Sequence, residues 1–368
     1  MARCFLLAPN AFKGSISAFD FCSVLSRELE ERGFRAVSLP LGDGGDGTAE
    51  VVAHYLGAGK VETVVPDALG RPHTARYYRQ GNTAVLELAE ACGLKWLKKQ
   101  EYDVTRASTR GFGSLINHAL GEGARELVLC VGGSASVDGG IGALREMGLV
   151  TEGWNGDGNG LTSVGRLDPT LLQRKFEGIR TRVLCDVENP LLGSTGAAAV
   201  FAPQKGASPE QVAWLEELLT RYADELCRVT GKNVRTLPRG GAAGGIAASF
   251  HALLGTELVS GSEYCLEISR FRERLQEADA VVTGEGRLDT QSLDGKIPGT
   301  VARVCRREKV PVYAVAGMAD REVIGCFDRV FTLSAMASSV TDSIKNAPYY
   351  LKLTADALVD ACYMDILY

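Results

Sequence analysis

The sequence predicts an α/β protein in which both ends of the chain build a doubly wound, parallel-sheet domain and a second α/β domain is inserted between them. Strand-like apolar runs alternate with helical patterns near both ends of the chain, which is typical of an open parallel sheet. Short strands separated by glycine turns follow residue 61 and indicate antiparallel pairing. A chain of 368 residues also exceeds the usual size of a single hydrophobic core.

The first part of the chain predicts a strand, a helix, a strand, a loop and a helix. Residues Cys4 to Ala8 form a short apolar run, and Ala36 to Leu41 form a second one. Between them, Ser17 to Arg32 carries apolar residues at helical spacing and ends before a glycine. A helix over Thr48 to Leu56 follows the glycine-rich loop GDGGDG.

The middle of the chain predicts a different pattern. The runs VETVVPD, HTARYYRQ and TAVLELA are predicted as short strands, and strands are also predicted over Glu126–Val131 and Arg182–Cys185. Ser208 to Thr230 is predicted as a long helix, with a serine cap and proline at the first helical position. The stretch Gly153 to Gly160 is predicted as a surface turn without a function.

The parallel pattern returns at the end of the chain. Strands are predicted over Ala280–Thr283, Val312–Ala316 and Arg329–Leu333. A helix is predicted over Thr300–Arg307, and a final helix follows the last strand and extends to about Leu367. We therefore predict a discontinuous domain of residues 1–61 and 275–368 and an inserted domain of residues 62–274.

Composition limits the classes of function. The chain is 45% hydrophobic and 23% charged, as is ordinary for a soluble protein, and its net charge of −5 argues against a general nucleic-acid binder. No run is long enough to span a membrane, and the N-terminus lacks a signal-peptide pattern. The ten cysteines form no metal-binding pair. We expect a cytoplasmic protein with reduced thiols.

The run Val281 to Pro298, VVTGEGRLDTQSLDGKIP, is the most informative loop candidate. Glycines there allow backbone amides to approach an anion, while charged side chains handle a metal, a proton or a phosphate. The charged residues of this run, Glu285, Arg287, Asp289 and Lys296, are therefore candidates for handling an anion, a metal or a proton. A bland exposed loop is the alternative.

Two further loops carry aspartates. Asp43 and Asp46 lie in GDGGDGT, where paired carboxylates could hold Mg²⁺, or where they simply cap a solvated turn. Asp186 directly follows a predicted strand and could serve as a base, as a metal ligand or as a cap. We take Asp43 and Asp186 as the best candidates for the base or a metal ligand.

The loop GGSASVDGGIG joins a predicted strand to a predicted helix. Backbone N–H groups near that helix N-terminus suit a phosphate, although a tight structural turn would have the same composition. We predict that Ser134 and Asp138 contact substrate or phosphate here. Lys13 and Lys205 could balance phosphate or carboxylate charge, or could be ordinary solvated lysines. The chain has no GxxxxGK[ST] motif and no GxSxG motif.

Taken in order, these loops resemble the type I glycerate kinase family over essentially the whole chain. The resemblance is carried by APNAFKGS, LGDGGDGT, VGGSASVDGG, CDVENPLLGSTGAA, FAPQKGA, GGAAGG and TGEGRLDTQSLDGKIP. The chain departs from the family's usual pattern at Asn10 and Ala11, at Ser136 and Val137, and at Asp46, where glutamate is more frequent.

The resemblance implies a flavodoxin- or Rossmann-like domain with a second α/β domain inserted and an active site in the cleft between them. It also implies an ATP- and Mg²⁺-dependent kinase that phosphorylates D-glycerate, commonly to 2-phosphoglycerate. In such a kinase we expect Glu285 and Arg287 to bind substrate or phosphate, and Asp289 and Lys296 to lie near the acceptor or the transferred phosphoryl group. The partners would be glycerate and a nucleotide, without nucleic acid or membrane. The sequence predicts neither the oligomeric state nor which hydroxyl is phosphorylated. A kinase for another small hydroxy acid and a non-catalytic anion sensor are the alternatives.

Overall fold

A computed structural model describes residues 3–153, 158–293 and 295–366. The chain forms two compact units: a terminal unit of Met1–Asp43 with Ser260–Tyr368, and an inserted unit of Gly44–Val259. These limits differ from the predicted domain limits because helix α2 (Thr48–Leu56) packs on strands of the inserted unit, whereas α10 (Gly261–Ile268) packs on α13 of the terminal unit. The predicted domain assignment itself stays a prediction.

The terminal unit contains a five-stranded sheet in the order β13-β12-β11-β1-β2, and every neighbouring pair is parallel. Its strands are β1 (Cys4–Pro9), β2 (Arg35–Ser38), β11 (Ala280–Leu288), β12 (Val312–Ala319) and β13 (Arg329–Thr332), and the helix α13 named above spans Ile297–Glu308. Phe5 of β1 lies opposite Ala280 of β11. The prediction that both ends of the chain build one sheet is therefore confirmed.

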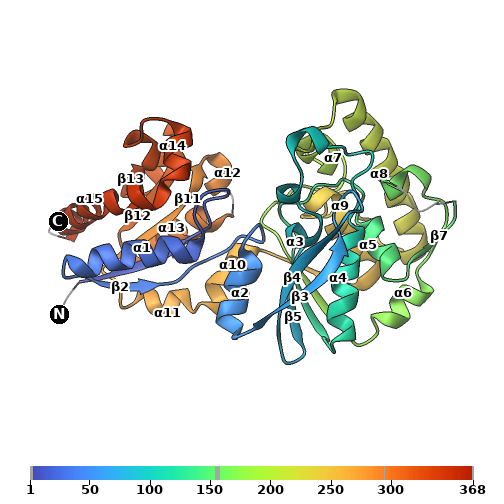
Figure 1. Ribbon diagram of the computed structural model, residues 1–368, viewed down its shortest axis with the longest axis horizontal. Helices are drawn as coiled ribbons and strands as arrows, with labels where there is room; N and C mark the ends of the chain where they lie inside the picture. Colours follow the sequence, from blue (N-terminus) through green and yellow to red (C-terminus); the bar gives the residue numbers. More distant parts are fainter. Residues whose placement is uncertain (1–2, 154–157, 294, 367–368) are drawn as a thin grey trace. The chain divides into compact units, whose positions relative to one another are not determined.

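Helices cover this sheet (Figure 1). They are α1 (Ala18–Glu31), α10, α11 (Phe271–Leu275), α12 (Thr290–Leu293), α13 (Ile297–Glu308), α14 (Val340–Lys345) and α15 (Ala347–Ile366). Helix α1 begins where predicted because the Ser17 side chain accepts a hydrogen bond from the backbone N–H of Asp20. Phe5, Phe21 and Leu351 belong to one buried cluster, which joins β1 to α1 and α15.

The inserted unit contains a six-stranded sheet in the order β10-β9-β6-β5-β4-β3. The pairs among β10, β9, β6 and β5 are parallel, while β5-β4 and β4-β3 are antiparallel, as the glycine turns predict. The strands are β3 (Gly59–Pro66), β4 (Pro72–Gln80), β5 (Thr83–Glu87), β6 (Glu126–Cys130), β9 (Arg180–Leu184) and β10 (Glu257–Val259). A small antiparallel pair, β7 (Val150–Thr151) and β8 (Leu167–Asp168), lies apart from this sheet.

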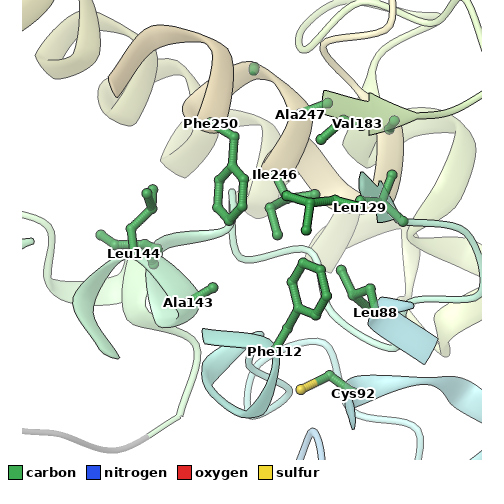
Figure 2. Close-up of a cluster of buried hydrophobic side chains, with 14 of the residues drawn as sticks. Leu88, Cys92, Phe112, Leu129, Ala143, Leu144, Val183, Ile246, Ala247 and Phe250 are labelled. Carbon is green, nitrogen blue, oxygen red and sulfur yellow. The ribbon is translucent and has the colours of Figure 1, made fainter. Parts of the chain in front are cut away.

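Eight helices accompany this sheet in the described part of the unit: α2, α3 (Leu88–Cys92), α4 (Arg110–Gly121), α5 (Ile141–Glu146), α6 (Thr170–Lys175), α7 (Ala197–Phe201), α8 (Pro209–Thr230) and α9 (Ala242–Leu254). Helix α8 has the predicted cap, since Ser208 accepts from the backbone N–H of Gln211. Figure 2 shows the core, where Phe112 of α4 and Phe250 of α9 lie among aliphatic side chains from both sheet strands and helices.

Two local predictions are corrected by the structure. Strand β5 ends at Glu87 and α3 begins at once, so the predicted strand TAVLELA is too long. The predicted surface turn at 153–160 lies partly outside the described residues. Within the described part, Asn159 is fully buried and donates to the carbonyl oxygens of Val104 and Val137, so it is a packing residue.

Among the described residues, we find no helix that is both long and apolar enough to cross a membrane.

Candidate functional site

Charged residues of the terminal unit gather around one cavity of about 320 Å³. Its lining includes all the sequence-predicted site residues of this unit except Asp43, namely Lys13, Glu285, Arg287, Asp289 and Lys296. Lys13 comes from the loop after β1, Lys296 precedes α13, and the other three follow one another along and after β11. Parallel strands place the loops after their carboxyl ends at the same edge, which explains this convergence.

The run around Glu285 is a strand and not a glycine-broken loop, which corrects the sequence interpretation. Strand β11 continues through Leu288 and keeps its parallel pairing with β12. Its glycines make close strand contact possible: a Cβ at Gly284 would lie 2.2 Å from the Val315 carbonyl oxygen. The glycines thus hold Glu285 and Arg287 on a rigid element beside the cavity.

Glu285 is the most buried charged residue of this cavity, with 8% of its surface exposed. Its Oε1 atom has no hydrogen-bond partner among the described residues. Burial raises the pKa of the Glu285 carboxyl to about 7; the nearby Ser292 hydroxyl and the charge of Lys296 oppose this shift, while Asp43 and Asp289 add to it. A buried hydrogen-bond acceptor without a donor lowers the stability of the folded protein, unless a ligand or a water molecule donates a hydrogen bond to it.

Two other charged residues of the cavity, Arg287 and Asp289, have partners within the unit. Arg287 forms an ion pair with Asp320, with 3.2 Å between Nη2 and Oδ1, and its side chain is largely exposed. Asp289 caps α12, because its Oδ1 accepts from the backbone N–H of Ser292 at 3.1 Å. Lys296 occupies the N-cap position of α13, and its side chain makes no capping hydrogen bond there. Asp43 is buried at the end of the first terminal-unit segment, close enough to Glu285 to influence its pKa.

In the inserted unit, the loop after β6 is held from inside by Lys205. This lysine is 2% exposed, and its Nζ donates to the Ser134 hydroxyl at 2.7 Å and to the Ser136 carbonyl oxygen at 2.6 Å. Burial lowers the pKa of Lys205 to about 7, and the charge of Asp138 opposes this shift. The structure therefore brings Ser134 and Lys205 together, as bonded partners inside the unit.

Asp138 is fully buried and accepts hydrogen bonds from several sides. Its Oδ2 accepts from the backbone N–H and the hydroxyl of Thr109, both at 2.8 Å, and from the backbone N–H of Gly142 at 3.3 Å. Its Oδ1 accepts from Gly140 at 3.2 Å. The carboxylate thus ties the start of α5 to the start of α4, a contact that the sequence did not indicate.

Three loops meet where β5, β6 and β9 end. The backbone N–H of Gly132 donates to the Gly44 carbonyl oxygen at 2.9 Å. A Cβ at Gly44 would lie 2.4 Å from the carbonyl oxygen of Leu184. Gly133 has φ +73°, and a Cβ there would lie 2.0 Å from Oδ1 of Asp46, so a glycine is required. This Oδ1 is buried without a hydrogen-bond partner among the described residues.

Glu87 is a buried residue of this region that the sequence analysis missed. Its Oε2 accepts from the backbone N–H groups of Gly47 at 3.0 Å and Ala49 at 3.3 Å, which holds the start of α2. Burial raises the pKa of Glu87 to about 7. The charge of Lys95 opposes this shift, and the charge of Asp46 adds to it. Its signal in the sequence was a charge within an otherwise apolar strand.

The remaining predicted residues lie as follows. Asp186 is half-buried just after β9 in the inserted unit. Asp43 and Asp46 belong to different compact units, so a magnesium site shared by them stays a prediction. The described residues contain no group of three or more histidine, cysteine or carboxylate side chains that could hold a metal ion. Mg²⁺ that arrives on nucleotide phosphates usually needs only one or two carboxylates, so such a group is not required for it.

Known proteins of one family match the chain. The profile of the Glycerate kinase family matches residues 5–363. The "Glycerate kinase" of Bacillus subtilis (strain 168) is 35% identical over 95% of both chains. The "Glycerate 2-kinase" of Escherichia coli (strain K12) is 35% identical over 85% of this chain and 84% of its own.

A solved structure agrees with these sequence matches. The crystal structure of a protein assigned as glycerate kinase 2 from Salmonella typhimurium LT2 is 33% identical and covers 98% of this chain and 99% of its own, with a TM-score of 0.78. The α/β fold with mostly parallel sheets is thereby confirmed. A family profile that spans nearly the whole chain, with relatives above 30% identity, decides the assignment: this chain belongs to the glycerate kinase family.

Proposed function

We propose that the protein is a cytoplasmic kinase that transfers the γ-phosphoryl group of ATP, bound with Mg²⁺, to a hydroxyl group of D-glycerate. The observation that carries this proposal is the charged cavity of the terminal unit in a chain of the glycerate kinase family. The product is phosphoglycerate, and 2-phosphoglycerate is the expected isomer.

The composition of the cavity suits phosphoryl transfer. This reaction depends on positioning and on neutralisation of charge more than on covalent help from the protein. Three cationic side chains line one cavity together with two carboxylates. The cationic residues are Lys13, Arg287 and Lys296. Lys13 or Arg287 would bind the glycerate carboxylate, and Lys296 and Asp289 would lie near the hydroxyl or the transferred group.

The remaining site assignments are proposals that follow from family membership. Asp43 and Asp186 are candidates for the base or for holding Mg²⁺, and Asp46 is a second candidate for Mg²⁺. Ser134, Asp138 and Lys205 are proposed to contact substrate or phosphate. Their inward hydrogen bonds support a role in which they fix the backbone N–H groups of the loop that binds the phosphate.

The test is an assay of the purified protein with ATP, Mg²⁺ and D-glycerate. We expect ADP release that depends on D-glycerate, and phosphorus NMR of the product should show one phosphate monoester, at the secondary hydroxyl if the product is 2-phosphoglycerate. L-Glycerate, glycolate and lactate are the comparison acceptors. Turnover with one of these and not with D-glycerate would identify a kinase for another hydroxy acid. Nucleotide or glycerate binding without turnover would instead support a sensor.

A further inference from the structure

We propose that Glu285 is the catalytic carboxylate that binds the reacting hydroxyl of the acceptor through Oε1 and takes its proton. This inference rests on the proposed kinase function and assigns to one residue the base that the sequence left open between Asp43 and Asp186.

One carboxylate oxygen of Glu285, Oε1, makes no hydrogen bond among the described residues. Glu285 is 8% exposed and lines the cavity, yet its Oε1 has no hydrogen-bond partner in the part of the chain that the structure describes. Buried polar atoms of native proteins are almost always paired. The hydroxyl group of a bound phosphoryl acceptor would donate a hydrogen bond to this atom.

Two neighbouring carboxylates, Asp289 and Asp320, already have structural partners. Oδ1 of Asp289 accepts from the backbone N–H of Ser292 and caps α12. Asp320 pairs with Arg287 at the rim. Glu285, by contrast, stands on the rigid strand β11 and can present its carboxylate without disturbing a helix start.

The electrostatic environment of Glu285 also suits a base. The charges that act on it come from Lys296 before α13, from Asp289 before α12 and from Asp43 after β2, while Lys13 and Arg287 line the same cavity. Burial raises the pKa of Glu285 to about 7. A base with a pKa near the working pH is deprotonated in about half of the molecules and still accepts a proton readily during the reaction.

The step balances with the proposed substrates alone. The hydroxyl proton passes to Oε1 of Glu285, and the hydroxyl oxygen forms the new bond to the γ-phosphorus. The bond from this phosphorus to the β–γ bridging oxygen breaks, and its electron pair leaves on ADP. Glu285 then releases the proton to water, while the cationic side chains balance the charge of the transferred group.

The test compares Glu285→Gln and Glu285→Asp with Glu277→Gln, an exposed glutamate of the same unit that pairs with Arg35. Glu285→Gln should lower kcat by about a hundredfold or more, with KM for glycerate and affinity for a non-hydrolysable ATP analogue within about threefold of wild type. Glu285→Asp should retain about a tenth of the wild-type kcat, and Glu277→Gln should behave as wild type.

The pH profile provides a readout that a structural role would not change. In wild type, kcat should fall below about pH 7, and this acidic limb should be absent from the residual activity of Glu285→Gln. A Glu285→Gln variant with kcat within about fivefold of wild type, or with the acidic limb intact, would overturn the inference. So would recovery of its kcat at high Mg²⁺, which would make Glu285 a metal ligand.

Two controls separate the possible failures. If Glu285→Gln does not give a folded protein by circular dichroism, Glu285→Asp decides, and a wild-type kcat in that variant overturns the inference. If wild type itself shows no turnover with any hydroxy acid, the proposed function fails. An active wild type with an equally active Glu285→Gln variant contradicts only the assignment of Glu285.

Discussion

In the terminal unit, Lys13, Glu285 and Arg287 line a cavity of about 320 Å³, and Oε1 of Glu285 is left without a partner among the described residues. In the inserted unit, Asp138 and Lys205 are more deeply buried than Glu285, and their charged atoms are hydrogen-bonded to backbone and hydroxyl groups of the same unit. Charged residues of glycine-rich motifs thus serve two different purposes in one chain.

This difference teaches that a motif marks a constrained position and does not by itself mark a ligand contact. A carboxylate that accepts hydrogen bonds from several backbone N–H groups holds a loop in its conformation. Its removal lowers the free energy of unfolding. A carboxylate with an unused oxygen beside a cavity costs stability in the free protein and is useful only with a ligand. Substitutions in the inserted unit should therefore act on stability first, and those in the cavity on turnover first.

The largest effect on stability is expected for Asp138→Ala. The change would leave the backbone N–H groups of Thr109, Gly140 and Gly142 without their acceptor in a fully buried place. We expect the free energy of unfolding of the inserted unit to fall by ~3–5 kcal/mol, as measured by urea denaturation. The matched control is Asp356→Ala, whose carboxylate pairs with Arg32 at the surface.

Asp138→Ala can also break the comparison. If the variant unfolds at the same urea concentration as the control but no longer binds nucleotide or glycerate, Asp138 contacts a ligand directly. Its hydrogen bonds would then be secondary to that role, and the inserted unit would use its motif residues in the same way as the terminal unit does.

A second prediction concerns Glu87→Gln and the pH dependence of stability. The pKa of Glu87 is raised by burial from 4.5 to about 7 in the folded state, so the folded protein holds this proton more tightly than the unfolded chain does. Its contribution to stability is complete below about pH 4.5 and is lost as the pH rises through about 7. The Glu87→Gln variant lacks this ionisable group, so its stability relative to wild type should increase at high pH.

The measurement is urea unfolding of wild type and Glu87→Gln at several pH values. Between about pH 4.5 and about pH 8, wild type should lose ~3 kcal/mol relative to the variant, because each unit of pKa shift corresponds to about 1.4 kcal/mol. Glu257→Gln, at an exposed glutamate of the same unit, is the control. Parallel pH curves for wild type and Glu87→Gln would show that Glu87 is not perturbed.

Much of the fold could be predicted from local signals. The caps at Ser17 and Ser208 fix the start of their helices through backbone hydrogen bonds, and both were visible as serine before a helical pattern. The alternation of strands and helices at both ends of the chain predicted the parallel sheet, because parallel neighbours need a crossover between them.

The candidate site could be predicted only in part. The residues of the terminal cavity follow strand ends, so their convergence was predictable from topology. The partner of each charged group was not, because burial and hydrogen bonding depend on residues far away in sequence. Lys205 and Ser134 meet across 71 positions, and Thr109 meets Asp138 across 29. Glu87 was missed because its role depends on the backbone N–H groups of Gly47 and Ala49, which lie about 40 positions earlier in the sequence.

The smallest effect is expected for Asp320→Asn, at the rim of the terminal cavity. Arg287 and Asp320 are largely exposed, with side-chain exposures of 58% and 45%, and their ion pair is 3.2 Å long. Such pairs contribute ~0–1 kcal/mol, so the free energy of unfolding should change by less than ~1 kcal/mol.

Removal of a carboxylate that competes for Arg287 should lower KM for an anionic acceptor by about two- to fivefold with kcat unchanged. Steady-state kinetics at low and high salt would check this, because the gain should shrink as salt screens the charges. A large loss of stability in Asp320→Asn would mean that cavity residues too are bound into the fold, and the contrast between the two units would disappear.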